Sequence, residues 1–141
     1  MIPFSLPDIG EREIAAVERV MKKGWISSGP EMEAFEQELA EYLGASNVVT
    51  LNSATAGLHL ALIAAGVGPG DKVMIPTLTF AATAEVVKAV GAEIVLSDVD
   101  AGTLCITAKQ MQAAWQDGIK AVIPVSFAGQ PLYIAETCKL S

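Results

Sequence analysis

Apolar positions recur at two different spacings along this chain. Up to residue 44, apolar residues fall three or four positions apart, as they do on one face of a helix. From residue 47 onward, short runs of Val, Ile and Leu indicate buried strands, and helical stretches separate them. Strands that alternate with helices predict right-handed crossovers. The sequence therefore predicts an α/β fold with a mostly parallel sheet flanked by helices.

Two helices are predicted before the first strand, and glycine and proline set their bounds. The first covers Glu11–Lys23, and Gly24 is placed to end it. The second begins at Pro30, which suits a first helical position, and Gly44 closes it. The apolar stripe of the first helix is Ile14, Val17 and Met21, and that of the second is Phe35, Leu39 and Leu43.

The remaining pattern predicts four strands in alternation with four helices. The strands are expected at residues 47–52, 72–76, 93–98 and 120–125. The helices are expected at residues 54–65, 80–90 and 107–117, and from residue 131 onward. The pattern is unfinished at residue 141, because the last predicted helix is interrupted there.

Composition excludes several classes of protein. With 141 residues, 52% of them hydrophobic and 18% charged, the chain resembles an ordinary globular domain and not a disordered segment. A formal net charge of −7 argues against a nucleic-acid partner. No apolar run approaches the ~18 residues of a membrane span, and the N-terminus lacks the features of a signal peptide. We therefore expect a cytoplasmic protein without a membrane partner.

The mean hydropathy of +0.44 is high for a chain of this length, although aromatic residues make up only 6%. Small and branched apolar residues suit a parallel sheet that is buried on both faces. A domain this short does not need so much burial. Either further protein covers part of its surface, or the domain is a tightly wound small one, and both interpretations stay open.

A phosphate site is predicted where the first strand meets its helix, because ligands of parallel sheets bind beyond the carboxyl ends of the strands. The Ser53 hydroxyl can cap the helix, which leaves the backbone N–H groups of Ala54 and Thr55 without intrahelical acceptors. Free amides at the positive end of a helix suit a phosphate group. The alternative is an ordinary capped helix start.

Two further strand ends carry candidate residues. Phe80 follows a buried strand, and its ring could project into the same crevice and stack on a flat heterocyclic cofactor. The alternative is that Phe80 belongs to the core. Ser126 follows the strand predicted at residues 120–125 and could line the same crevice, but it is assigned no role.

The loop at residues 24–30 holds one of two tryptophans, Trp25, beside Ile26 and Ser27. Three turn-forming residues, two glycines and a proline, accompany them. The loop either covers a site or is held to the core by its indole.

Other reactive side chains are assigned no chemistry. His59 has no candidate co-ligand nearby, and a turn through Gly102 accounts for Asp98 and Asp100. The two cysteines lack a CxxC context, and with one histidine they cannot form a zinc site, so no metal is expected. No GxGxxG follows a strand and no GxxxxGK[ST] is present, which argues against a dinucleotide-binding Rossmann domain and a P-loop NTPase.

Seven collinear segments resemble the N-terminal part of the DegT/DnrJ/StrS-type nucleotide-sugar aminotransferases. They are Pro3-Phe4-Ser5 with Ile9-Gly10 and Glu13, residues 24–30 (GWISSGP) with Phe35-Glu36, 52–62 (NSATAGLHLAL), 68–71 (GPGD), 76–83 (PTLTFAAT), 98–100 (DVD) with Thr103-Leu104, and 124–131 (PVSFAGQP). One segment alone is unspecific, whereas seven in order make a strong resemblance. The form of the second is especially similar to enzymes that aminate 4-keto sugars on nucleotide carriers.

The resemblance implies an aspartate-aminotransferase-like fold, known as fold type I, and a homodimer with active sites at the subunit boundary. It implies pyridoxal 5′-phosphate (PLP) as cofactor, a nucleotide-linked keto sugar as substrate and glutamate as amino donor, in amino-sugar and surface-polysaccharide biosynthesis. The implied cofactor-binding residues are Ser53, Ala54, Thr55 and Phe80, and the implied substrate-proximal residues are Trp25, Ile26 and Ser27.

The chain also departs from the family pattern. The family's Schiff-base lysine follows a Ser-Phe pair, and its pyridine-binding aspartate lies in a Glu-Asp-Ala-type strand end; neither motif occurs here. Residues 1–141 therefore resemble the N-terminal portion of the PLP-binding large domain without the small C-terminal domain, and no catalytic residue is assigned. We expect the chain alone to be inactive. The alternatives are a non-catalytic α/β remnant or interaction module, and an unrelated nucleotide-binding α/β domain.

Overall fold

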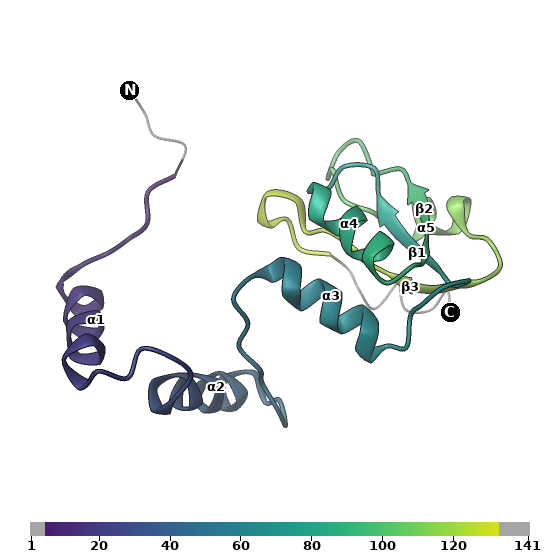
Figure 1. The fold of residues 1–141 in the computed structure, drawn as a ribbon. Helices are drawn as coiled ribbons and strands as arrows, with labels where there is room; N and C mark the ends of the chain where they lie inside the picture. The colour runs from purple at the N-terminus through teal and green to yellow at the C-terminus, as the bar shows by residue number, and fades with distance from the viewer. Residues whose placement is uncertain (1–4, 133–141) are drawn as a thin grey trace. The chain divides into compact units, whose positions relative to one another are not determined.

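The computed structural model describes residues 5–132, and the chain divides into two compact units after Thr50. The first unit is helical and the second is built on a sheet (Figure 1). Among the described residues, the sheet has three parallel strands in the order β2-β1-β3, with helices against it. The predicted α/β fold with a mostly parallel sheet flanked by helices is confirmed.

The first unit contains α1 (Glu11–Lys23) and α2 (Pro30–Leu43), with the predicted bounds. The Glu13 carboxylate accepts a hydrogen bond of 2.7 Å from the Gly10 amide at the start of α1, which satisfies one of the free donors there. Gly24 and Gly44 follow the two helices with φ of 71° and 64°, values that glycine adopts without strain.

The second unit consists of α3 (Ala54–Ala64), β1 (Lys72–Pro76), α4 (Ala81–Ala89), β2 (Glu93–Ser97), α5 (Ala108–Ala114), β3 (Ile119–Val122) and the 3₁₀ turn η1 (Phe127–Gly129). Alternate residues of β1 face opposite sides of the sheet. Val73 and Ile75 pack in a cluster that includes residues of α3 and α4. Met74 packs in a second cluster that includes Met111 of α5. The core therefore lies on both faces of the central strand.

One predicted strand is wrong. Residues 47–52 form no strand, and no described segment pairs with them. The Thr50 amide donates instead to the Glu36 carboxylate at 2.7 Å, and the side chain of Val49 is 74% exposed. Because a strand needs a neighbouring strand to accept and donate its main-chain hydrogen bonds, apolar β-branched residues alone do not form one.

The other differences are shifts of helix and strand ends. Helix α5 is shorter than predicted because Trp115 already has an extended backbone, and Gly118 then turns the chain with φ 87° into β3. Strand β3 ends before Pro124, which has no N–H to donate. The helix predicted from residue 131 lies, beyond Leu132, outside the described residues.

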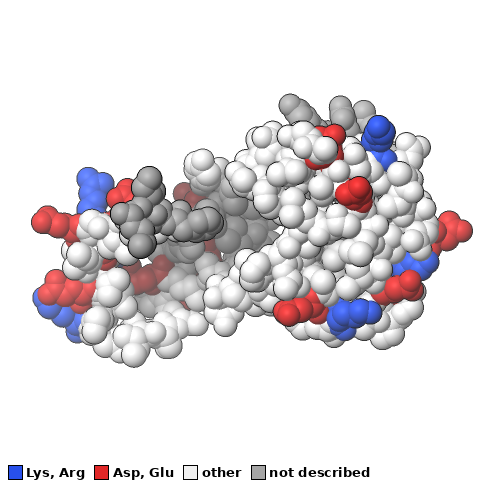
Figure 2. All heavy atoms as spheres, turned by 90° about the horizontal axis from the view of Figure 1, so that it is seen from above, with Lys and Arg blue, Asp and Glu red and all other residues white. Residues whose placement is uncertain are grey.

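Large apolar side chains remain exposed in both units. They include Ile14, Val17 and Met21 of α1, and Leu60 and Ile63 of α3. Figure 2 shows wide areas without charged side chains on one face of the protein. None of the helices among the described residues is long and apolar enough to cross a membrane.

Candidate functional site

The start of α3 has the predicted cap. Ser53 has an extended backbone, and its Oγ accepts a hydrogen bond of 3.1 Å from the Ala56 amide. The next two amides, those of Ala54 and Thr55, have no acceptor among residues 5–132. Both residues are exposed. The helix therefore begins with two free main-chain donors at its positive end, which is the arrangement that anions bind.

An open groove lies beside this helix start, between residues of α3 and of α4. Its lining residues are Asn52, Ser53, Thr55, Ala56, His59, Glu85, Val86 and Ala89. Neither His59 nor Glu85 is assigned a role from the sequence. Thr55 and His59 are four residues apart, and this spacing places them on one helix face, which was the signal available in the sequence.

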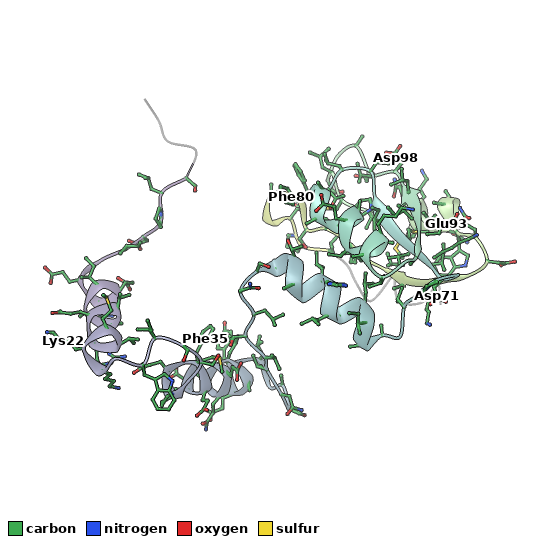
Figure 3. The ribbon with its side chains drawn as sticks, viewed as in Figure 1. Lys22, Phe35, Asp71, Phe80, Glu93 and Asp98 are labelled. Atoms are coloured by element: carbon green, nitrogen blue, oxygen red, sulfur yellow. The ribbon has the colours of Figure 1, made fainter. Side chains whose placement is uncertain are left out.

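Phe80, labelled in Figure 3, is the N-cap residue of α4. The residue is 79% exposed. Its carbonyl accepts the Thr83 amide at 3.0 Å, and the Thr79 hydroxyl bonds the buried Thr83 hydroxyl at 2.8 Å. Phe80 therefore does not belong to the core that residues 51–132 form. Phe80 is not among the described residues that line the groove at Ser53, so its contact with a cofactor stays a prediction.

The loop between α1 and α2 is held together by its tryptophan. The Trp25 Nε1–H donates to the Ser28 carbonyl at 2.8 Å. The ring lies so close to the buried Gly29 that a Cβ there would meet indole atoms at 2.5–2.9 Å. Trp25 and Ile26 are nevertheless 57% and 81% exposed, and Ser27 is exposed as well. The indole fixes the loop locally without entering a core of the described residues.

The acidic residues after β2 form a turn, as the sequence predicts. Asp100 Oδ1 accepts hydrogen bonds from the amides of Gly102 and Thr103 at 3.1 and 3.0 Å. The hydrogen bonds from Thr103 and Gly102 lower the pKa of the Asp100 carboxyl below its ordinary value. Asp98 Oδ1 accepts the Val99 amide at 2.8 Å. Both carboxylates therefore accept hydrogen bonds from main-chain amides that follow them closely in the chain.

The remaining candidates are possible metal ligands, the two cysteines and Ser126. Within residues 5–132, no three His, Cys, Asp or Glu side chains are placed to hold a metal ion. Cys105 is a buried free thiol, and Cys138 lies outside the described residues. Ser126 is exposed, and its carbonyl accepts the Gly129 amide at 3.1 Å in η1.

The model of the DegT/DnrJ/EryC1/StrS aminotransferase family matches residues 7–141. The chain belongs to this family. The resemblance carried by the seven sequence segments is therefore confirmed.

Solved structures of aminotransferases share this fold. Spr1654 from Streptococcus pneumoniae, named as a sugar aminotransferase and solved in its PMP form, is 38% identical over 99% of this chain and 35% of its own, with a TM-score of 0.91. An aminotransferase from Psychrobacter cryohalolentis is 33% identical over 98% of this chain and 36% of its own, with a TM-score of 0.90. NtdA from Bacillus subtilis, solved with bound cofactor PMP, is 29% identical over 99% and 33%, with a TM-score of 0.88. The chain spans 35% of the length of Spr1654.

Proposed function

We propose that residues 1–141 are the N-terminal portion of the cofactor-binding large domain of a PLP-dependent sugar aminotransferase. The free amides of Ala54 and Thr55 at the start of α3 carry this proposal. Membership of the aminotransferase family supports it, as does the likeness to Spr1654, which has been solved in a PLP form at 38% identity.

The residues at this helix start fit the phosphate of PLP. Two N–H donors and the positive helix end favour an anion, and the capping bond of Ser53 keeps the α3 start in this conformation. The side chains around them are small, so the main chain can approach the ligand closely. The exposed ring of Phe80 offers a flat apolar face for the pyridine ring. When bound, PLP supplies an electron sink for transamination.

The proposed substrates follow from the family. They are a keto sugar on a nucleotide carrier and glutamate as amino donor, in amino-sugar or surface-polysaccharide biosynthesis. Trp25, Ile26 and Ser27 are the proposed substrate-proximal residues. The working form is proposed to be a cytoplasmic homodimer.

The chain alone is proposed to be inactive. Neither the family's lysine motif nor its aspartate motif occurs among its 141 residues, and without that lysine no base moves the proton in the reaction. Glutamate and a nucleotide-linked keto sugar should give no amino-sugar product when incubated with the chain and PLP. If mass spectrometry detects amino-sugar product after incubation with the 141-residue chain, the proposal that the chain alone is inactive is wrong.

Two substitutions of Ser53 test the phosphate site. Ser53→Ala removes the cap and should lower the free energy of unfolding by about 1 kcal/mol. Ser53→Asp keeps a capping acceptor, so stability should remain, but its charge repels a phosphate at the neighbouring amides. The readout is the ¹H–¹⁵N shift of the Ala54 and Thr55 amides on titration with PLP and with inorganic phosphate.

We expect both ligands to shift these two amides in the unsubstituted chain and neither to shift them in Ser53→Asp. Unfolding in denaturant checks that Ser53→Asp stays folded. If PLP binds and the amides of Ala54 and Thr55 do not respond, the phosphate site lies elsewhere and the proposal fails.

A further inference from the structure

Thr83 is a polar residue on the buried face of α4. Its exposed fraction is 4%, and the other buried residues of this helix are apolar: Ala82, Val86 and Val87. Valine has nearly the same shape as threonine and would fill such a position without a polar group to satisfy. A buried hydroxyl must instead find a hydrogen-bond partner, so the partner indicates what the hydroxyl contributes.

The partner of this hydroxyl lies on the loop before the helix. Thr79 Oγ1 donates to Thr83 Oγ1 at 2.8 Å. The main-chain amide of Thr83 donates to the Phe80 carbonyl at 3.0 Å. Thr83 therefore holds the residue before Phe80 through its side chain, and Phe80 itself through its main chain.

The other end of this loop is fixed by the sheet. The Thr77 amide donates to the Ser97 carbonyl at 2.9 Å, directly beyond the pairing of β1 with β2. The main chain of residues 77–80 is thus anchored at both ends, while Phe80 remains exposed. A ring on a fixed main chain has only its side-chain torsions left to order, so it can stack on a flat ligand at a lower cost in conformational entropy.

We propose that Thr83 is a positioning residue for the cofactor ring, because its hydroxyl bond to Thr79 holds the main chain at Phe80 in the conformation that presents the aromatic ring. The inference rests on the proposed function, in which Phe80 stacks on the pyridine ring. It deepens that function, since it assigns a buried residue to the ring contact. If Thr83 served only the packing of α4, Thr83→Val would leave ligand binding unchanged.

The test separates the ring of the ligand from its phosphate. Pyridoxamine 5′-phosphate (PMP) carries both and has no aldehyde that would react with lysine side chains, whereas inorganic phosphate carries no ring. The dissociation constants of both ligands are measured from the ¹H–¹⁵N shifts of the Ala54 and Thr55 amides in the full chain. We expect PMP to bind the unsubstituted chain more tightly than phosphate does, and Phe80→Ala should weaken PMP binding about three- to tenfold.

Two substitutions break the hydroxyl pair from opposite sides. Thr83→Val keeps the shape of the buried side chain, and Thr79→Ala removes the partner on the loop. Each should weaken PMP binding about two- to fivefold, through the entropy of the loop, and leave the affinity for phosphate unchanged. Thr83→Ser keeps the hydroxyl and should bind PMP as the unsubstituted chain does. In a Phe80→Ala background, Thr83→Val should add no further loss, because a positioning residue acts only through the residue that it positions.

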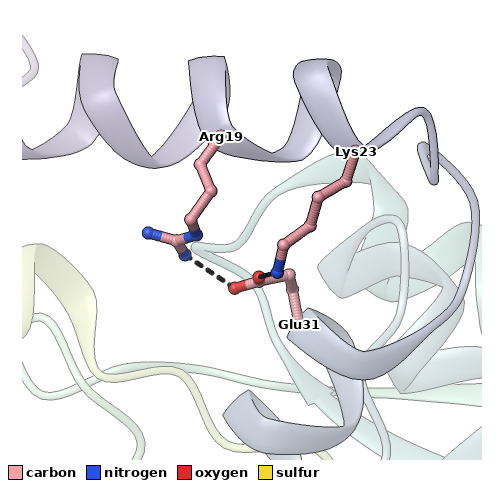
Figure 4. A network of polar contacts seen from close by, with 3 residues as sticks. All are labelled: Arg19, Lys23 and Glu31. Carbon is pink, nitrogen blue, oxygen red and sulfur yellow. Dashed lines mark hydrogen bonds and ion pairs between the residues drawn. The ribbon is translucent and has the colours of Figure 1, made fainter.

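Two control variants change stability without touching the hydroxyl pair. Val87→Ala opens a cavity on the buried face of α4 and should lower the Tm without changing the ratio of the two affinities. In the first unit, the Glu31 carboxylate accepts hydrogen bonds from Arg19 and Lys23 at 2.8 and 3.1 Å (Figure 4). Glu31→Gln weakens these ion pairs and should leave both affinities unchanged. Circular dichroism and thermal unfolding check that every variant folds.

Several results would overturn the inference. One is equal PMP affinity in Thr83→Val and the unsubstituted chain. Another is a loss in Thr83→Val that extends to inorganic phosphate or adds to that of Phe80→Ala, because Thr83 would then act on the fold and not on the ring.

The proposed function and this inference fail in different ways. If inorganic phosphate shifts neither the Ala54 nor the Thr55 amide, the phosphate site is wrong and the inference fails with it. If phosphate and PMP bind and Phe80→Ala leaves PMP binding unchanged, the ring contact is wrong and so is the role of Thr83. If Phe80→Ala weakens PMP binding and Thr83→Val does not, the inference alone is wrong.

Discussion

At the scale of single residues, Gly29 is required by a side chain and not by its backbone angles. Its φ of 179° is extended and open to any residue, yet it is buried beneath the Trp25 ring. Nothing in the order of residues 24–30 shows this contact, because it depends on where the indole folds. Sequence alone left open whether Trp25 is held to a core, and the structure shows it held to its own loop.

Gly29→Ala should therefore displace the indole. An added Cβ would lie 2.5 Å from Trp25 Nε1, so the ring must move and lose its bond to Ser28. Overpacking of this kind costs about 1–3 kcal/mol, and less where the ring can swing out. The measurement is the emission maximum of Trp25 in a Trp115→Phe background, which should move to the red as the ring becomes hydrated.

Gly68→Ala is the matched control for this substitution. A Cβ at Gly68 meets nothing within 4 Å, and its backbone lies outside the left-handed region. We expect no change in the emission of Trp25. An unchanged spectrum in Gly29→Ala would show that the indole does not rest on Gly29.

At the scale of helices and strands, a cross-link ties the turn before β1 to β3. Asp71 Oδ2 accepts hydrogen bonds from the Gly68 amide at 2.9 Å and from Lys120 Nζ at 3.0 Å, and Lys120 also donates to the Gly66 carbonyl. The hydrogen bond from Lys120, and then that from Gly68, lower the pKa of the Asp71 carboxyl below its ordinary value of 3.8.

This cross-link predicts a loss of stability in acid. A carboxyl whose pKa is lower in the folded state stabilises the fold above its unfolded pKa, and that contribution is lost as the pH falls through the folded value. The free energy of unfolding should therefore decline below pH ~4. Asp71→Asn should reduce stability at pH 7 and make the acid decline shallower, as measured by urea unfolding from pH 7 to pH 2.5.

Asp117→Asn serves as the control, since Asp117 has no hydrogen bond or ion pair through its side chain within residues 5–132. An acid decline that is equally steep in Asp71→Asn and in the unsubstituted chain would contradict the prediction. Partial exposure of the pair, 29% for Asp71 and 42% for Lys120, means that salt should weaken the effect.

Helix bounds could be predicted from the sequence because their signals are local. Four residues set these bounds, and each lies within one turn of the helix that it begins or ends: Gly24, Pro30, Gly44 and Ser53. Residues 47–52 could not be placed in the same way, since a strand depends on a partner strand from any distance along a chain. The exposure of Phe80 could not be predicted for a similar reason, because it depends on which other parts of the protein pack around the start of α4.

At the scale of the whole chain, the high mean hydropathy finds its counterpart in exposed apolar side chains. Most of the surface of helix α3 is apolar, apart from Thr55 and His59, yet only one of its faces packs, through Leu58 and Leu62, against the core of its unit. Leu60 and Ile63 are 48% and 52% exposed. Large apolar side chains exposed side by side on a helix are expected to be covered, which supports the interpretation that further protein covers this surface.

Leu60→Gln with Ile63→Gln should therefore reduce self-association of the 141-residue chain. Analytical ultracentrifugation over a range of concentrations should show the unsubstituted chain associating and the double variant shifted toward the monomer, with unchanged circular dichroism. Leu58→Gln is the contrasting variant, since it places an amide against the buried cluster and should destabilise the second unit instead. Neither substitution changes the amides of Ala54 and Thr55 at the start of α3, so the double variant should keep its response to phosphate. A dilute monomer in the unsubstituted chain would mean that this apolar face is stable in water.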